Sequence, residues 1–277
     1  AMSNITFQYN ASAASGSGSG SSSSSSFAYA NNKLSAGSYH TCAILDNGDL
    51  KCWGLDDSGQ LGDGGGNTDT NAPSPTAIDL GTGRTAVAVS ADWHRTCAIL
   101  DNGDLKCWGL DDFGQLGDGG SNTYTNAPSS TAIDLGTGRT AVAVSAGRYH
   151  TCAILDNGDL KCWGRDDSGQ LGDGGINTDT NAPSSTAIDL GTGRTAVSVA
   201  AGGSHTCAIL DNGDAKCWGK HNLGQLGSAV TISNQASPIL VSGSNTWDSS
   251  TTASSGSGSG SGGGMTNVTG ATCTVSP

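Results

Sequence analysis

The sequence predicts an all-β protein built from four tandem repeats of 55 residues, and three observations support this fold class. The segment TCAILDNGDLKCWG begins at Thr41 and returns at Thr96, at Thr151 and, with Ala215 in place of leucine, at Thr206. The four Trp-Gly pairs are always 55 residues apart, a fixed period that indicates a propeller, a solenoid or another array. Each unit also carries a hairpin pattern, and no window has a helical period.

The repeated segment predicts a β-hairpin. Asp46-Asn47-Gly48 fits a three-residue loop, closed by glycine in the left-handed conformation, between the strands TCAIL and DLKCWG. In that register Ile44 faces Leu50 and Cys42 faces Cys52, so both sulfur atoms lie on one face of adjacent strands. A two-residue Asn-Gly loop shifts the register by one and separates the sulfurs. We therefore favour the register that joins each cysteine pair in a disulfide.

Two further strands complete the unit. The apolar run TAVAVSAG at 140–147 ends in glycine and predicts a strand before the hairpin. The segment TAIDL at 76–80 follows an Asn-Ala-Pro turn and predicts a fourth strand. One such sheet has too little apolar surface to be stable alone, so we expect neighbouring copies to cover its two faces.

The repeats set the expected domain organisation. The four units lie at about 34–89, 90–144, 145–199 and 200–242. Residues 1–33 combine a strand pattern with a Gly/Ser-rich segment, and residues 243–277 combine a second Gly/Ser-rich segment with another strand pattern. This last strand belongs either to the repeat array or to the start of a following domain.

The composition limits the partners. The chain has 12 Lys and Arg residues against 24 Asp and Glu residues, and its formal net charge of −12 repels nucleic acid and anionic membranes. No run of about 18 apolar residues is present, so we expect no membrane span. We expect no cofactor, with calcium as the one candidate ion.

The cysteines indicate the compartment. Eight of the nine form four local pairs with the same spacing, and Cys273 is left over as the expected free thiol. Paired cysteines without other clustered metal ligands favour an oxidising setting, so we expect a secreted or cell-surface protein. The pairs are Cys42 with Cys52, Cys97 with Cys107, Cys152 with Cys162, and Cys207 with Cys217.

The repeat resembles that of the regulator of chromosome condensation family. The motifs that carry the resemblance are Ala36-Gly37, His40-Thr41, Trp53-Gly54 and Gly59-Gln60-Leu61-Gly62, which recur in later units. The cysteine-containing form is similar to secreted microbial members. The resemblance implies a β-propeller of four-stranded blades, with the tryptophan packed between blades, the glycines shaping a loop and each histidine bonded within its own blade.

The family's usual ring has seven blades, whereas this chain has four units, so the sequence leaves three alternatives for ring closure. In the first, four blades close alone; in the second, the terminal segments add a blade or strands; in the third, an open arc closes through another chain. We favour a small ring to which the terminal segments add strands.

Metal sites are the first candidate chemistry. His40, His150 and His205 share one column, but Arg95 in the same column opposes a zinc site. The Asp- and Asn-rich loops offer oxygen ligands that suit calcium, although solvated turns are the simpler interpretation. The acidic pairs that begin at Asp56, Asp111 and Asp166 are expected on the solvated surface. The calcium candidates are Asp63, Asp69, Asp173 and Asp179.

The positions that differ between repeats are the strongest functional signal. The first and third units differ at only five positions, so a changed residue on this uniform scaffold stands out. The varied positions lie in connecting loops, where binding residues are usually found, although neutral drift remains the alternative. The candidate binding residues are Tyr39, Trp93, His94, Phe113, Tyr124, Arg148, Tyr149 and Arg165.

These patterns predict a function class without catalysis. No serine, free cysteine or carboxylate pair has the setting of a nucleophile or an acid–base pair, and no glycine-rich loop precedes a helix. We expect a non-catalytic extracellular module that recognises a protein or a glycan through its varied loops. The alternative is a structural stalk or fibre subunit joined through its terminal strands, and self-association fits either function.

Overall fold

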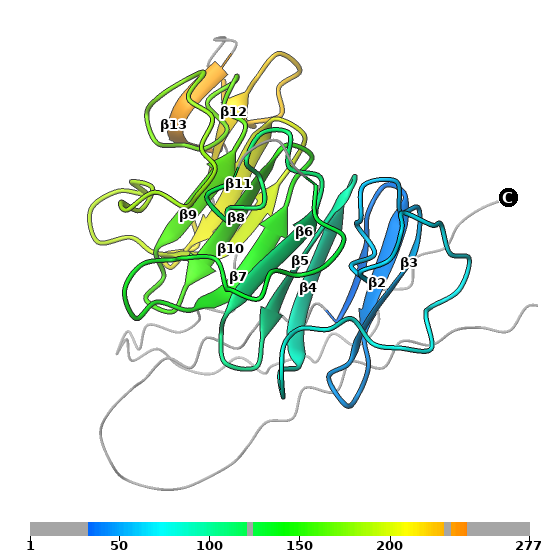
Figure 1. Ribbon diagram of the computed structural model, residues 1–277. Helices are drawn as coiled ribbons and strands as arrows, with labels where there is room; N and C mark the ends of the chain where they lie inside the picture. The colour runs from blue at the N-terminus through cyan, green and yellow to red at the C-terminus, as the bar shows by residue number, and fades with distance from the viewer. Residues whose placement is uncertain (1–32, 121–123, 230–233, 243–277) are drawn as a thin grey trace, which may run out of the picture.

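The computed structural model describes residues 33–120, 124–229 and 234–242, which contain thirteen strands and no helix. Figure 1 shows these strands as sheets that lie side by side in an arc, one sheet for each sequence repeat. Nothing within these ranges forms a helix able to span a membrane. The hairpin and the strand before it that the sequence predicts are therefore present in the repeats.

We call the four sheets blades 1 to 4, and all neighbouring strands within them are antiparallel. Blade 1 contains β1 (Leu34–Ala36), β2 (His40–Ile44) and β3 (Leu50–Gly54). Blade 2 contains β4 (Ala86–Asp92), β5 (Arg95–Leu100) and β6 (Leu105–Gly109). Blade 3 contains β7 (Ala141–Ala146), β8 (His150–Leu155) and β9 (Leu160–Gly164). Blade 4 contains β10 (Ala196–Ala201), β11 (His205–Leu210), β12 (Ala215–Lys220) and β13 (Asn234–Leu240).

The predicted hairpin register is confirmed. Ile44 pairs with Leu50 and Cys42 pairs with Cys52, and the same register recurs in the other blades. Gly48 closes the loop with a φ of 83°, a conformation that glycine adopts without steric cost. All four predicted disulfides are present. Cys273 lies outside the described residues.

The prediction of a fourth strand at 76–80 is wrong, because blades 1 to 3 each contain three regular strands among the described residues. The outer edge of blade 1 is held by an isolated bridge between Gly54 and Thr70 and by one bond from Ile78 N–H to the Leu50 carbonyl. The Asp79 carboxylate instead accepts the N–H of Gly81, so this segment turns away. In the described part of the chain a regular fourth strand forms only as β13, in the fourth repeat, where the connection after the hairpin is shorter.

The core lies between blades rather than within them. Each hydrophobic cluster combines one face of a blade with the facing side of the next, as in the cluster of Ile44, Leu50, Leu100 and Trp108. Trp108, Trp163 and Trp218 are fully buried in these junctions. The prediction that neighbouring copies cover each other's faces is confirmed at each junction between consecutive blades of the arc.

One backbone carbonyl organises each junction. The carbonyl of Gln60 accepts hydrogen bonds from Trp108 Nε1–H at 3.2 Å and from the Thr96 hydroxyl at 2.8 Å, both in the next repeat. A carbonyl oxygen has two lone pairs, so both bonds are compatible. Gln115 and Gln170 play the same role at the following junctions.

Blades 1 and 4 stand at opposite ends of the arc (Figure 1). Every residue of β5 and β8 is buried, whereas buried and half-buried residues alternate along β2 and β11. Within the described residues the four blades therefore form an arc with uncovered ends. The terminal segments, which we expected to add strands or a blade, lie outside those residues.

Candidate functional site

The varied loops meet at one edge of the arc. His40 pairs with Gly54 at the end of the hairpin opposite its Asp46-Asn47-Gly48 loop, so the residues before β2 and after β3 are neighbours. Arg95 and Gly109 bring the corresponding loops of blade 2 to the same edge, as does the equivalent pair in blade 3. Residues far apart in sequence thus share one surface.

Aromatic side chains from three repeats form a continuous chain of ring contacts along this edge. Tyr39 contacts His94 with ring centroids 5.4 Å apart, and His94 contacts Trp93 at 4.6 Å. Tyr149 then contacts both Trp93 at 5.5 Å and Phe113 at 5.7 Å, in edge-to-face geometry. This geometry is the favourable arrangement for aromatic pairs.

Two guanidinium groups cover parts of this chain. Arg148 lies 4.4 Å from the Trp93 ring centre and 5.0 Å from that of Tyr149. Arg165 lies 4.6 Å from the Phe113 ring and 5.0 Å from Tyr149. Such cation–π contacts hold the planar cations over the rings. We call the seven residues the rim cluster: Tyr39, Trp93, His94, Phe113, Arg148, Tyr149 and Arg165.

Two acidic residues that sequence reasoning missed as site residues, Asp57 and Asp167, contact the rim cluster. Asp57 accepts from His94 Nδ1 at 2.8 Å, and Asp167 pairs with Arg165 at 2.8 Å. Burial raises the pKa of the Asp57 carboxyl, but hydrogen bonds from His94 and Gln60 outweigh this and leave the pKa below its ordinary value. Their position in the repeat was the signal that could have identified them, since each acid is the third residue after the glycine of a Trp-Gly pair.

Arg148 is the exposed cation of the cluster. Its guanidinium forms no ion pair with any described residue, whereas Arg165 is held by Asp167. Trp93, beside it, has a φ of 37°, which is rare for a bulky residue. An uncommon backbone conformation that the fold maintains is a reason to suspect a functional role.

Tyr124 is the candidate binding residue that does not join the cluster. Its side chain is exposed and makes no ring contact within the described part of the chain. The structure thus brings together seven of the eight candidates.

The acidic loops use their carboxylates internally. Asp63 and Asp173 accept the N–H groups of Gly65 and Gly175, two residues further on. Asp69 accepts the N–H of Asp56 at 2.9 Å, and Asp179 accepts the equivalent N–H of Asp166 at 2.7 Å. No group of three metal-ligating side chains gathers among the described residues, so the calcium hypothesis gains no support there.

The expectation that each histidine bonds within its own blade is wrong. His40 Nε2 lies 2.7 Å from the Thr96 hydroxyl of blade 2, and His150 Nε2 lies 2.7 Å from the Thr206 hydroxyl of blade 4. Because the Thr96 proton is donated to the Gln60 carbonyl, the imidazole is the donor to the hydroxyl oxygen. The histidine column therefore links consecutive blades.

Arg95 substitutes for histidine at the middle junction. Its buried guanidinium donates to the carbonyls of Gly147 and His150, at 2.6 and 2.9 Å, in the next blade. Burial lowers its pKa to about 10, so the group remains charged at neutral pH. The column is a series of inter-blade bonds, which leaves His40 and His150 engaged rather than free for zinc.

The prediction of solvated acidic pairs is wrong for the first member of each pair. Asp56, Asp111 and Asp166 are buried, and their carboxylates accept the N–H of Leu61, Leu116 and Leu171 respectively. Burial raises the pKa of Asp111 and of Asp166 to about 6. These carboxylates shape the loop beneath the next tryptophan.

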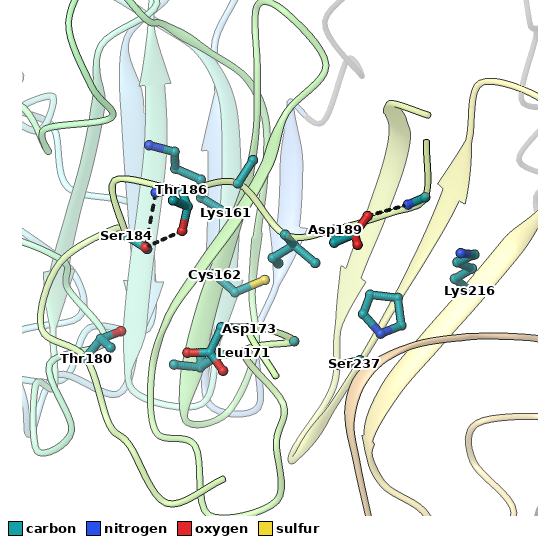
Figure 2. A pocket seen from close by; sticks show the side chains of 15 residues that line it. Lys161, Cys162, Leu171, Asp173, Thr180, Ser184, Thr186, Asp189, Lys216 and Ser237 are labelled. Atoms are coloured by element: carbon teal, nitrogen blue, oxygen red, sulfur yellow. Dashed lines mark hydrogen bonds between the residues drawn. The ribbon is translucent and has the colours of Figure 1, made fainter. Parts of the chain in front are cut away.

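A separate cavity of about 450 Å³ lies between blades 3 and 4 (Figure 2). Two lysines line it, but Lys161 Nζ donates to the Leu135 carbonyl and Lys216 Nζ to the Leu190 carbonyl, each at 3.0 Å. Cys162 is held in a disulfide. The two lysines and the cysteine are thus engaged in structure, and the corresponding hollow of blade 1 measures only about 30 Å³.

Comparison with known proteins agrees with this architecture. Residues 32–60, 86–115, 141–170 and 196–225 match a sequence model of the Regulator of chromosome condensation (RCC1) repeat. Residues 102–154 and 157–209 match a second model of the same repeat.

Curated relatives share part of the chain. The chain is 32% identical over 210 residues to the E3 ubiquitin-protein ligase HERC2 of Homo sapiens. The aligned segment covers 76% of this chain and 4% of that protein. The chain is 35% identical over 197 residues to the Ultraviolet-B receptor UVR8 of Arabidopsis thaliana, which is 70% of this chain and 42% of that protein. The chain thus spans less than half the length of these relatives.

Solved structures support the fold. Human WBSCR16 has a TM-score of 0.65 at 23% identity, covering 75% of this chain and 52% of that one. Prp20p of Saccharomyces cerevisiae has a TM-score of 0.64 at 21% identity, covering 79% and 50%. These likenesses identify the four sheets as blades of a β-propeller. Together with the matched repeats, they show that this chain belongs to the RCC1 repeat family.

Proposed function

We propose that this chain is a non-catalytic extracellular binding module that recognises a protein through the rim cluster. The observation that carries the proposal is the convergence of seven varied residues from three repeats into one surface. The first and third repeats are nearly identical, with only five differences between them. Two of those five, Arg148 and Arg165, lie in the cluster. This concentration supports recognition over the alternative of neutral drift at exposed positions.

The side chains of the cluster define the chemistry of the partner. Aromatic residues and arginine are the commonest anchors of protein interfaces. The guanidinium of Arg148 has no ion pair among the described residues, so it is available to a carboxylate. Over longer distances the net charge of −12 favours a partner that is not itself strongly acidic. The site suits a protein surface with a local carboxylate among apolar groups.

The cluster favours a protein over a glycan. A sugar ring stacks on an open aromatic face, but guanidinium groups lie over the rings of Trp93, Phe113 and Tyr149. Tyr39 is the most exposed ring of the cluster. Support from relatives points the same way, because Prp20p has binding properties toward Gsp1p and histones, which are proteins.

The extracellular setting rests on the four disulfides, since paired cysteines persist in oxidising compartments. Counting free thiols in the protein isolated from its source tests this part of the proposal. One free thiol per chain is expected, from Cys273; several would contradict it. The alternative of a stalk joined through terminal strands concerns segments outside the described residues.

The repeat itself supplies matched variants for the binding test. The double variant R148S/R165L installs the residues of the first repeat, Ser38 and Leu55, at the same positions. The control I176G installs Gly66 of that repeat at an exposed loop position that has no hydrogen bond, ion pair or ring contact with the cluster among the described residues. Both changes are compatible with the scaffold because a natural copy already carries them.

Binding is measured on arrays of peptides that carry a carboxylate beside aromatic residues, on their amide counterparts, and on glycans. We expect the wild type and I176G to bind carboxylate peptides. R148S/R165L is expected to bind at least about tenfold more weakly, a loss of about 1.4 kcal/mol. Equal binding by both variants, or binding to glycans only, contradicts the proposal.

A further inference from the structure

Among the described residues, the two ends of the arc leave opposite faces uncovered. In β2, Thr41 and Ala43 are half-buried between buried neighbours. In β11 the half-buried residues are His205, Cys207 and Ile209, which are the other set. Because successive side chains of a strand point to opposite faces of the sheet, blade 1 exposes its Thr41 face and blade 4 exposes its His205 face.

Inside the arc, a face of the first kind always meets a face of the second kind. Thr96 and Trp108 are the blade 2 equivalents of Thr41 and Trp53, and both donate to the Gln60 carbonyl of blade 1. The same pair of bonds forms at the two later junctions. Three copies of one interface therefore show how such faces fit together.

The end faces hold the unpaired halves of that interface. Trp53 is only half-buried, and neither its Nε1–H nor the Thr41 hydroxyl has a hydrogen-bond partner among the described residues. At the other end, the Gln225 carbonyl and the His205 imidazole likewise have no partner within the described ranges. Donors at one end match acceptors at the other.

We propose that two copies of this chain associate head to tail, with blade 1 of one copy packed on blade 4 of its partner. Trp53 Nε1–H and the Thr41 hydroxyl donate to the carbonyl of the partner's Gln225, and the partner's His205 donates to the Thr41 hydroxyl. A second copy fits these faces because the tryptophan and threonine bonds to the glutamine carbonyl already join consecutive blades three times, and the histidine–threonine bond joins them twice. A head-to-tail contact generates a closed ring or an open filament, depending on the rotation between copies.

The fourth repeat makes this junction weaker than the internal ones. Ser35 accepts the N–H of Ala91 across the first junction at 2.9 Å, whereas Ala200 stands at the serine position in blade 4. Val241 also contacts Gly227 where Trp108 contacts Gly62, so docking has to displace that side chain. The association is accordingly expected to reverse on dilution.

The first experiment measures the mass of the full-length chain by sedimentation velocity over a range of concentrations. The wild type is expected to form a species of two or more chains that dissociates on dilution. Trp53→Ala and Ile209→Lys, each at a half-buried position of one end face, are expected to weaken association at least about tenfold. The exposed control Y124D installs the aspartate of the first and third repeats and is expected to behave as the wild type.

A mixing experiment tests the head-to-tail geometry. W53A retains an intact blade 4 face, and I209K retains an intact blade 1 face. An equimolar mixture is therefore expected to form a two-chain complex at concentrations where each variant alone stays monomeric. An isologous interface, in which both copies use one patch, does not give this complementation.

A gain of affinity is the third readout. Ala200→Ser restores the missing acceptor at an exposed position, and it is expected to tighten association about fivefold, the effect of one hydrogen bond. A wild type that stays monomeric at all concentrations overturns the proposal, including the case in which its own terminal segments cover the faces. Unchanged association in both W53A and I209K overturns it as well. The rim cluster lies outside these faces, so failure here leaves the binding function untouched.

Discussion

Trp163 lies so close to Gly117 of the preceding blade that a Cβ atom on Gly117 would overlap its indole Nε1. Gly117 also has a φ of 79°, which favours glycine on conformational grounds. The same pairing joins Trp108 to Gly62 and Trp218 to Gly172. The tryptophan of the next repeat therefore packs against the last glycine of the repeated Gly-Gln-Leu-Gly motif.

The variant G117A separates the two costs of losing this glycine. Its matched control is G138A, which has a φ of 69° and no atom within 4 Å of the added Cβ. We expect G138A to lower the free energy of unfolding by about 1–2 kcal/mol, the cost of a left-handed alanine. G117A should cost at least about 2 kcal/mol more, since it also overpacks the junction. Urea denaturation measures both free energies of unfolding. Equal losses would show that Trp163 moves aside without lowering the stability.

Truncating the tryptophans should reveal the end of the arc. Trp163→Ala removes a fully buried side chain and its bond to the Gln115 carbonyl, so we expect a loss of about 3–5 kcal/mol in unfolding free energy. Trp53→Ala should cost about 1 kcal/mol or less in the dilute monomer, because no blade covers that face in the described arc. Chemical denaturation at low protein concentration compares the two, and similar losses would mean that blade 1 is covered.

Acid should destabilise the fold through its buried histidines. Burial, with smaller contributions from Arg95 and His205, lowers the pKa of His150 from 6.5 to about 3. Below pH 6.5 the unfolded chain binds a proton that folded His150 does not, so stability is full above pH 6.5 and falls as the pH drops toward 3. The slope from this group is about 1.4 kcal/mol per pH unit.

The variant H150Q tests this effect, since a neutral amide retains a donor for the Thr206 hydroxyl. Its stability deficit relative to the wild type should shrink between about pH 6 and about pH 4. Asp111 and Asp166 act in the opposite sense in both proteins: their pKa values are raised to about 6, so their protonation stabilises the fold as the pH falls. The difference between the two proteins cancels that contribution, and a constant deficit would argue against a buried neutral His150.

The disulfides should contribute unequally along the arc. Each joins cysteines ten residues apart, which gives about 3 kcal/mol by the chain-entropy estimate. The double variant C152A/C162A should lose this and some packing, because Cys152 is fully buried in a junction. C207A/C217A should lose less, since Cys207 is half-buried on the uncovered face. Equal losses in denaturation experiments would indicate an effect on the unfolded chain alone.

Local patterns carried much of the fold. The strand positions, the loop at Asp46-Asn47-Gly48 and the pairing of Cys42 with Cys52 follow from period, turn chemistry and spacing within a dozen residues. The prediction of a regular strand at 76–80 was wrong because backbone groups of this segment bond to side chains. The Leu80 carbonyl, for example, accepts a hydrogen bond from Lys106 Nζ of the next blade. Such competition is not visible in an apolar pattern.

The candidate site was predicted residue by residue but not as a surface. Variation between repeats identified Tyr39, His94 and Tyr149, yet their contacts depend on how one blade is placed against the next. The burial of Asp56 was missed for another reason: its carboxylate turns into its own loop and accepts the N–H of Leu61, a local bond that the acidic pair does not reveal.

The amino-acid order alone established a four-fold repeat of disulfide-linked β-hairpins, since hydrogen bonding and turn preference act over a few residues. Which side chains meet across blades was settled by three-dimensional packing. His40 reaches Thr96 across 56 positions of sequence, and that contact exists only because sheets with too little apolar surface stack face to face. The rim cluster and the two uncovered ends of the described arc arise from that stacking, and they carry the functional proposals.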